Sequence, residues 1–541
     1  MQINMENMNR RDSSIKVCGS NRRDFLRGAT ATLGMLISGG MDRINGRAYG
    51  LPKFASNPFS LGIASGDPLP DGFVIWTRLA PDPLNGGGMK NEDQEVKWRI
   101  ATDEKMQRIV RQGSYFARPE LAHSVHVEIN GLEPDSVYWY QFHAGSESSV
   151  VGRTRTAASN SAKLANFTFA FVSCQNWLPG YYAAYKHLAG EDLNLIVHLG
   201  DYIYESALTS SSKGYRSING LPSPVLEEIV NLAQYRLRYS LYKTDPNLQA
   251  AHAAFPWIVT WDDHEVCNNY AGDHDPKNTP HEEFLRRRAN AYQAYYEHMP
   301  LRATSLPHGP DMRLYRRLTF GDLVEFNVLD TRQYRTRQPC GDGIKSLCAD
   351  NMNEKSSLMG NEQQQWLFDG LQKSGAKWNV LAQQVLMAQL DVKPGTEQQF
   401  EMDKWMFIPE RDRMMKFFAE HKTLNPVVIT GDIHSNWVAD LKSNFNDPKS
   451  AVVGTEFVGT SISSGGDGED RPDRVEPVLS DNPHIKFFNG QRGYVRCKID
   501  SSKWQTDYKV VRDIESTDAP ISTRTSFVVQ SGKPGAVEAG E

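Results

Sequence analysis

The stretch Leu193-Asn-Leu-Ile-Val-His-Leu-Gly-Asp-Tyr-Ile-Tyr-Glu205 shows how most of this chain is built. It begins with a mostly apolar run, residues 193–199, which is typical of a strand buried on both faces of a sheet. Ionisable and aromatic residues follow at once, from Asp201 to Glu205. In open α/β sheets, ligands bind beyond the carboxyl ends of the strands. The stretch therefore predicts a buried strand that leads directly into a functional site.

Further apolar runs between residues 164 and 516 repeat this pattern. They are expected to be strands and lie at residues 167–173, 257–260, 323–329, 378–381 and 426–429. Helical patterns lie between them, at about 280–298 and at 360–374, where Asn361 is the expected N-cap. Strands that alternate with helices predict an α/β fold for residues 164–516.

The preceding region, residues 50–156, has a different pattern. Short segments of alternating or aromatic residues are expected to be strands at residues 72–77, 96–101, 124–129 and 136–142. Such spacing predicts a small all-β sandwich of immunoglobulin or fibronectin type, with no catalytic cluster of its own. A linker rich in Ser and Ala follows at residues 157–163, and residues 517–541 are expected to form a flexible tail.

Residues 1–49 are expected to be an export signal. Arg22-Arg23-Asp-Phe-Leu precedes a modest apolar run, Gly28 to Gly40, that is shorter than the about 20 apolar residues of a membrane span. This order of features is typical of a removable signal, and the paired arginines resemble the twin-arginine type. We therefore expect the twin-arginine translocase as a partner, a periplasmic or extracellular location, and no transmembrane segment. The alternative is a flexible tail with a chance pair of arginines.

Composition and cysteine usage narrow the classes of function. The 541 residues carry a formal net charge of −5, and no basic stripe is visible, so nucleic-acid-specific binding is not expected. The six scattered cysteines do not form a disulfide-stabilised scaffold. Cys340 and Cys348 enclose a short loop that an oxidising compartment would close with a disulfide, the alternative being two free thiols. Cys267 is expected to be a buried structural thiol.

Polar clusters follow five of the predicted strands and supply the residue types that metal-assisted chemistry needs. They are residues 173–176, 200–205, 261–265 with Asn268 and Asn269, 330–332, and 431–436. A phosphate ester resists attack because its oxygens are negative, and cations neutralise this charge. Thiolate, phenolate and carboxylate suit a ferric ion, oxygen ligands suit Ca2+, and imidazole suits iron or zinc. Each cluster alone fits a turn or a core residue, but five at strand ends favour a metal site.

The motifs in these clusters resemble those of a known superfamily. Gly-Asp-x-x-Tyr, Asp-His-Glu and a late Gly-Asp-x-His resemble the calcineurin-like metallophosphoesterases, and the Tyr is similar to that of purple acid phosphatases. The longer strings Ser-Cys-Gln, Gly-Asp-Tyr-Ile-Tyr-Glu, Trp-Asp-Asp-His-Glu-Val-x-Asn-Asn and Gly-Asp-Ile-His-Ser resemble the PhoD-type alkaline phosphatase/phosphodiesterase family. This resemblance covers nearly the whole chain. It implies a metallophosphoesterase β-sandwich flanked by helices, which follows the small N-terminal β domain.

The resemblance also implies the ligands of a binuclear or larger metal cluster. The ligands of Fe3+ would be Cys174, Asp201, Tyr204 and His434. The ligands of a second site, for Ca2+, would be Asp201, Asp263, Asn268 and Asp432. Asn269, the next residue in the chain, is an equal candidate for the ligand position given to Asn268. Cys174 stands where purple acid phosphatases have an aspartate.

The implied activity is the hydrolysis of phosphate mono- or diesters by a secreted enzyme that serves phosphate acquisition. A metal-bound hydroxide would attack phosphorus in line. His264 would act as general acid or hydrogen-bond donor, and Arg332 would clamp the phosphate oxygens with its planar fork. One alternative is an exported calcium-binding adhesion or structural protein, which would have no need of Cys, Tyr and His on one cation. A haloperoxidase-like use of the same scaffold is a further alternative.

Overall fold

Two large sheets hold the strands that precede the polar clusters. The computed structural model describes residues 53–209, 214–421 and 425–540, so the expected export signal lies outside the described residues. A ten-stranded sheet has the order β24-β23-β22-β21-β9-β10-β11-β1-β2-β5, and a seven-stranded sheet has the order β12-β13-β15-β17-β19-β18-β20. All six strands expected between residues 164 and 516 lie in these two sheets, so that part of the prediction is confirmed.

The bounds of these strands are as follows. In the ten-stranded sheet they are β1 (Ile63–Leu69), β2 (Gly72–Arg78), β5 (Ser124–Ile129), β9 (Phe167–Val172), β10 (Leu195–His198), β11 (Pro256–Val259), β21 (Gly493–Ile499), β22 (Lys503–Val511), β23 (Ile521–Gln530) and β24 (Lys533–Glu538). In the seven-stranded sheet they are β12 (Arg316–Phe320), β13 (Val324–Val328), β15 (Trp378–Ala382), β17 (Pro426–Thr430), β18 (Asn436–Lys442), β19 (Val452–Val458) and β20 (Ile485–Asn489).

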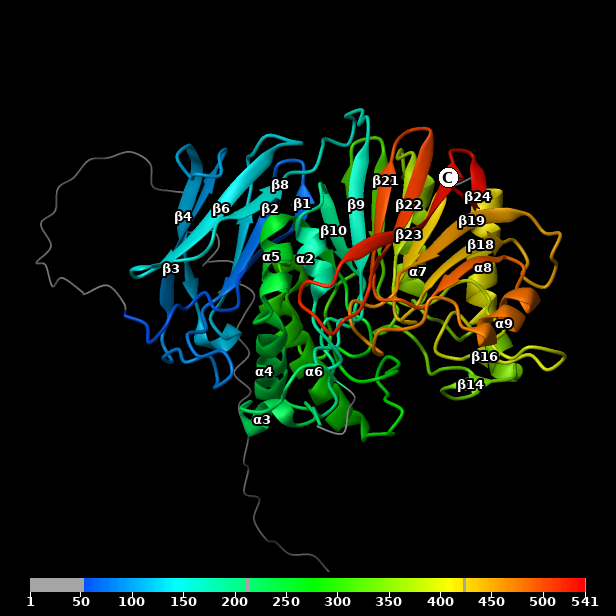
Figure 1. Cartoon of the computed structure of the whole chain (residues 1–541), viewed down its shortest axis with the longest axis horizontal. Helices are drawn as coiled ribbons and strands as arrows, with labels where there is room; N and C mark the ends of the chain where they lie inside the picture. Colours follow the sequence, from blue (N-terminus) through cyan, green and yellow to red (C-terminus); the bar gives the residue numbers. More distant parts are fainter. Residues whose placement is uncertain (1–52, 210–213, 422–424, 541) are drawn as a thin grey trace, which may run out of the picture. The chain divides into compact units, whose positions relative to one another are not determined.

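The two sheets share one apolar core, and helices cover their other faces. Successive side chains of a strand point to opposite faces, so Phe169 lies in the core between the sheets while Ala170 packs under helices. One group of helices contributes to the core on the outer face of the ten-stranded sheet: α2 (Ala183–Ala189), α4 (Leu232–Lys243), α5 (Pro246–Ala254) and α6 (His281–His298). Helices α7 (Asn361–Lys373) and α8 (Ile408–Glu420) cover the other sheet (Figure 1). The expected sandwich flanked by helices is thus confirmed.

The N-terminal β region is a sandwich, and one of its two sheets continues into the α/β region. Its second sheet consists of β3 (Gln94–Ala101), β4 (Ile109–Ala117), β6 (Val137–Ala144), β7 (Glu147–Ser148) and β8 (Gly152–Arg155). This sheet packs against β1, β2 and β5 over a common apolar core. Strand β1 also pairs in parallel with β11, with Ser65 opposite Pro256 and Gly66 opposite Trp257. The expected all-β region is present, but it is joined to the rest of the fold by backbone pairing.

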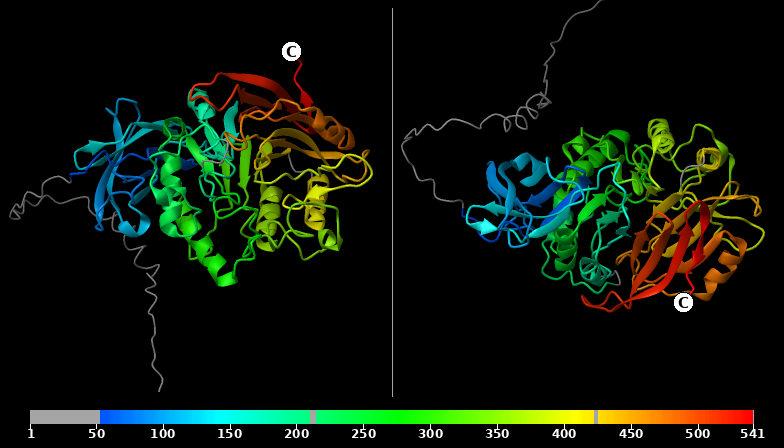
Figure 2. Two further views of the ribbon diagram at one scale, coloured as in Figure 1. Left: turned by 60° about the horizontal axis from the view of Figure 1, so that its bottom comes forward. Right: turned by 90° about the horizontal axis from the view of Figure 1, so that it is seen from above.

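Two expectations about elements were wrong. The segment from residue 517 onward is not a flexible tail, because its ribbon forms strands that continue the sheet (Figure 2). Strand β23 pairs with β22 along nine residue pairs and buries Phe527 and Val529 in the core between the sheets. The N-cap of α7 is Gly360 rather than Asn361, and its φ of 71° explains why glycine occupies this position.

The remaining elements are short. They are helices α3 (Ser223–Leu226) and α9 (Glu476–Asp481), the two-stranded pair β14 (Ile344–Lys345) with β16 (Phe400–Glu401), and four 3-10 helices: η1 (Pro119–Leu121), η2 (Ala303–Ser305), η3 (Ala349–Met352) and η4 (Asp473–Val475). Within the described residues, no helix is both long and apolar enough to cross a membrane.

Candidate metal centre

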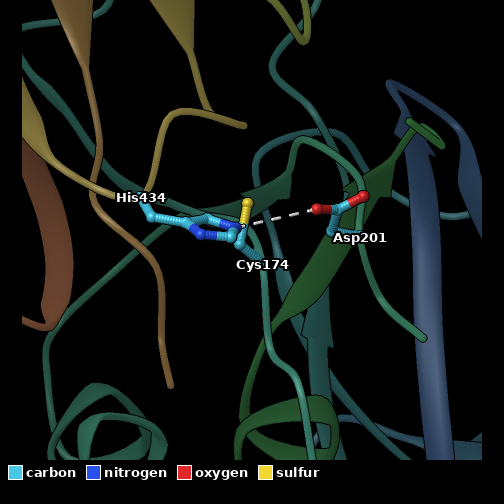
Figure 3. Close-up of side chains that lie close together, drawn as sticks. All are labelled: Cys174, Asp201 and His434. Atoms are coloured by element: carbon cyan, nitrogen blue, oxygen red, sulfur yellow. Dashed lines mark ion pairs between the residues drawn. The ribbon is translucent and has the colours of Figure 1, made fainter. Parts of the chain in front are cut away.

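The ends of parallel strands bring the predicted metal ligands together. Strands β9, β10 and β11 run in parallel and are followed by Cys174, Asp201 and Asp263, and β17 of the other sheet is followed by Asp432 and His434. Ligand atoms lie within 4.8 Å of one another in three groups: Cys174 with Asp201 and His434, Asp201 with Asp263 and His264, and Asp262 with Asp263 and Asp432. Figure 3 shows the first group converging from separate segments. Shared members make the three groups one continuous site.

The backbone turns sharply at four of the predicted ligands. Cys174, Asp201, Asp432 and His434 all have positive φ angles, of 59°, 56°, 64° and 56°. Non-glycine residues seldom adopt this conformation, and such strain concentrates at functional sites. Both Gly-Asp motifs have a steric reason for their glycine, because a Cβ would lie 2.5 Å from Asp262 at Gly200 and 2.6 Å from Ser173 at Gly431. The strands therefore end in sharp turns, and these turns carry side chains whose ligand atoms lie close together.

The phenol of Tyr204 links the predicted iron ligands. Its hydroxyl donates to Asp201 Oδ2 at 2.8 Å and lies 3.1 Å from Nε2 of His434. The hydroxyl of Ser464, which is not among the predicted ligands, lies 2.7 Å from the phenol oxygen and 2.7 Å from the carbonyl oxygen of Cys174 and can donate to either. Cys174, Asp201, Tyr204 and His434 thus meet as expected.

The charges of this group fit a bound cation. Burial raises the pKa of the Cys174 thiol, the Asp201 carboxyl and the Tyr204 phenol well above their ordinary values. Burial and Arg492 lower the pKa of His434 to about 3, so its imidazole is neutral and has a lone pair to offer. Asp201 Oδ1 and Asp262 Oδ2 are buried without a hydrogen-bond partner. Buried anionic donors of this kind are stabilised by a metal ion, which these residues therefore fit.

His264 is held by a carboxylate that the sequence reasoning did not select. Its Nδ1 lies 2.6 Å from Oε2 of Glu205, and its side chain is 16% exposed. Burial lowers the pKa of His264, but Glu205, Asp263 and Asp201 outweigh this effect and raise the pKa well above its ordinary value. The imidazolium is therefore able to donate a proton at the edge of the site.

Glu265, the last residue of the Asp-His-Glu motif, organises the turns. Its carboxylate accepts hydrogen bonds from the backbone amides of Asp201, Tyr202 and Asp262 at 3.1, 2.5 and 2.8 Å. This buried residue thereby fixes two ligand-bearing loops to each other.

Arg332 lies deeper than a phosphate clamp would. Its side chain is fully buried, its Nε donates to Asp262, and its Nη1 and Nη2 donate to Asp403 at 2.6 and 3.1 Å. Carboxylates occupy every edge of the guanidinium, so this placement favours a role in positioning Asp262 rather than the expected contact with phosphate.

Lys404 brings a second cation to the site. Its ammonium contacts Asp432 and lies 3.5 Å from Asp403. The side chain is 10% exposed, whereas that of Arg332 is not exposed at all. Neither Asp403 nor Lys404 follows a recognisable motif, so the sequence carried no signal for them.

The two asparagines differ in their contacts. The backbone amide of Asn268 donates to Glu205 at 2.9 Å, and the residue is exposed. The backbone amide of Asn269 donates to Asp263 at 2.6 Å, while its side-chain amide donates to both oxygens of Asp342. Neither contact uses the side-chain oxygen of Asn269, which is the atom that would bind a cation, so Asn269 stays an alternative to the predicted ligand Asn268.

The predictions for three of the cysteines agree with the structure. Cys340 and Cys348 form a disulfide, and Cys267 is a buried free thiol.

Comparisons with known proteins agree with this geometry. The family model described as PhoD-like phosphatase matches residues 169–508, and the model of the PhoD-like phosphatase N-terminal domain matches residues 46–158. Alkaline phosphatase D of Bacillus subtilis (strain 168) is 49% identical over 523 residues, which is 95% of this chain and 88% of the relative. A solved structure of PhoD superposes with a TM-score of 0.87 at 50% identity, covering 91% of this chain and 94% of the other.

Proposed function

Because this chain belongs to the PhoD-like phosphatase family and is a hydrolase of phosphoric esters, we propose that it uses a mixed centre of Fe3+ and Ca2+. An adhesion or structural protein is not favoured. The observation that carries the proposal is the convergence of Cys174, Asp201, Tyr204 and His434 on one point.

The ferric site is assigned from donor chemistry. A thiolate, a phenolate and a carboxylate together supply negative charge that suits a trivalent cation, and a neutral imidazole completes the set. Cys174, Asp201, Tyr204 and His434 are these donors. Ser464 supports the arrangement because it can donate to the oxygen of Tyr204.

The second site is assigned to calcium because its donors are oxygens. Asp263 and Asp432 share one group of ligand atoms, and Asp201 belongs to the neighbouring group with Asp263. We add Asn268, whose backbone is held by Glu205. When bound, the cations would neutralise the phosphate oxygens and lower the pKa of a water molecule.

The protein's own residues position the substrate and move a proton. Glu205 accepts from Nδ1 of His264 and stabilises the imidazolium, so Nε2 is the nitrogen that gives a proton to the leaving oxygen. The buried guanidinium of Arg332 holds Asp262 and Asp403 in place through ion pairs. We assign the binding of the phosphate oxygens to the ammonium group of Lys404, since its side chain is partly exposed beside Asp432.

We propose further that the chain is exported by the twin-arginine translocase and acts in the periplasm or outside the cell, where it releases phosphate for uptake. The motif Arg22-Arg23-Asp-Phe-Leu supports this, and the disulfide between Cys340 and Cys348 suits an oxidising compartment.

A paired assay with metal analysis tests the proposal. Purified protein is assayed on p-nitrophenyl phosphate and on bis-p-nitrophenyl phosphate, with and without chelator, and its iron and calcium contents are measured by mass spectrometry. We expect chelator-sensitive hydrolysis, with iron and calcium both retained, and the ratio of the two rates sorts monoesterase from diesterase activity. Full activity in protein that contains neither metal would contradict the proposed centre.

A further inference from the structure

A disulfide ring lies against the metal centre. The ring, residues 340–348, is closed by the bond between Cys340 and Cys348. Only Cys340, Asp342 and Gly343 of the ring are half-buried, and the rest of it is exposed. Ile344 and Leu347 are 55% and 46% exposed, so apolar packing does not fix their positions. The disulfide and polar contacts, rather than apolar packing of these two side chains, therefore restrain this segment.

The first contact of the ring reaches the Asp263 side of the centre. Both carboxylate oxygens of Asp342 accept hydrogen bonds from the side-chain amide of Asn269, at 2.9 and 3.0 Å. Gln338, just before the ring, donates to the carbonyl of Asn269 at 2.7 Å. Asn269 has a positive φ of 53°, and its own amide donates to Asp263 at 2.6 Å. The ring thus positions Asn269, and Asn269 in turn positions Asp263.

The second contact reaches the Asp432 side. Strand β14 of the ring pairs with β16, and the amide of Met402 donates to the carbonyl of Gly343 at 3.0 Å. The next two residues are Asp403, which receives the guanidinium of Arg332, and Lys404, whose ammonium contacts Asp432. One covalently closed segment therefore supports both flanks of the oxygen-rich half of the site.

We propose that the disulfide ring is a positioning element for the second cation. The inference rests on the proposed calcium site. Opening the ring would return conformational freedom to an exposed segment, so the hydrogen bonds of Asp342 and Gly343 would form only part of the time. Residues that orient metal ligands from behind typically change metal affinity or activity by about 10–100-fold when they are removed.

Calcium dependence tests this proposal. The full chain, loaded with iron, is compared with the variant Cys340→Ser/Cys348→Ser and with Asp342→Ala. Leu347→Ser and Asp350→Ala are the controls: the first alters an exposed ring residue, and the second removes a carboxylate just outside the ring. Two quantities are measured: the calcium concentration for half-maximal activity, and the calcium retained per chain after gel filtration.

For the ring-opened variant and for Asp342→Ala, we expect the half-maximal calcium concentration to rise by about 10-fold. The retained calcium falls, while kcat at saturating calcium stays near that of the unaltered chain. The controls keep the original calcium dependence. Asp342→Ala leaves the disulfide closed, so it keeps the proposal testable if the ring-opened variant does not fold.

Two results would overturn the proposal. If Asp342→Ala and the ring-opened variant bind calcium as tightly as the unaltered chain, the ring has no positioning role. If the unaltered chain is fully active and retains no calcium, the proposed second site is itself absent and the inference falls with it.

Discussion

The phenol of Tyr204 is the contact that joins the separate halves of the predicted iron site. Tyr204→Phe removes one oxygen and keeps the ring that lies 4.1 Å from the ring of His264. We expect loss of bound iron, loss of visible absorption from the tyrosinate, and a fall in kcat/KM of about 100-fold or more. Tyr202→Phe is the matched control, because the phenol of Tyr202 contacts His252 instead. Unchanged absorption in Tyr204→Phe would contradict the ligand assignment.

The ion pair between Glu205 and His264 is expected to set the pH dependence of kcat/KM. Because Glu205 raises the pKa of His264, Glu205→Gln lowers that pKa. A general acid loses activity as the pH rises through its pKa, so the alkaline limb of kcat/KM moves to lower pH in the variant. The measurement is a pH profile of both proteins, with the exposed Glu227→Gln as control. An unmoved alkaline limb would rule out His264 as the proton donor.

Lys404 is expected to bind substrate rather than hold the fold. Lys404→Gln removes a charge beside Asp432, so KM for a phosphate monoester rises and kcat/KM falls by about 10-fold or more. Lys393→Gln, on an exposed ion pair with Glu397, is the control. If kcat/KM is the same in both variants, Lys404 does not contact the phosphate.

Sequence motifs identified the residues that converge as predicted ligands, but not the residues that hold them in place. Cys174, Asp201 and His434 stand at strand ends in recognisable strings, so their convergence could be predicted. Asp403 could not, because it is 71 positions from Arg332 and follows no motif. The role of Arg332 depends on that partner, and for this reason the sequence suggested a phosphate clamp where the structure has an internal ion pair.

Among the elements, strands with continuous apolar runs were predictable and β23 was not. Strand β23 reads Ile-Ser-Thr-Arg-Thr-Ser-Phe-Val-Val-Gln, and only Phe527 and Val529 are buried. A strand with so few buried side chains has a weak hydrophobic pattern, and its pairing with β22 and β24 depends on tertiary context.

The C-terminal strands contribute to stability. Phe527→Ala should lower the free energy of unfolding by about 3–5 kcal/mol, because the ring packs between the sheets. Val537→Ala, at a side chain that is 70% exposed, should change it by less than about 0.5 kcal/mol. Denaturant titrations of both variants measure the difference. Equal midpoints would mean that β23 is dispensable.

Metal removal should affect the whole molecule. Bound cations stabilise the native state by mass action, by about 2.7 kcal/mol at 100 times the dissociation constant. Burial raises the pKa of Asp201 and Asp262 in the metal-free chain, so the stability that their neutral forms provide is lost as the pH rises through those pKa values. Chelation should therefore lower the thermal midpoint more at alkaline than at acidic pH. Calorimetry with and without chelator measures this, and a midpoint that chelator does not shift would argue against structural cations.

The parallel pairing of β1 with β11 makes the N-terminal region a sheet neighbour rather than a detachable module. A shortened chain that starts at residue 164 would leave the backbone groups of β11 without their partner strand. Exposed strand edges of this kind recruit other chains, so such a fragment is prone to self-association even with every metal ligand intact. Exchange of N-terminal regions between relatives would have to preserve this strand contact as well as the linker sequence.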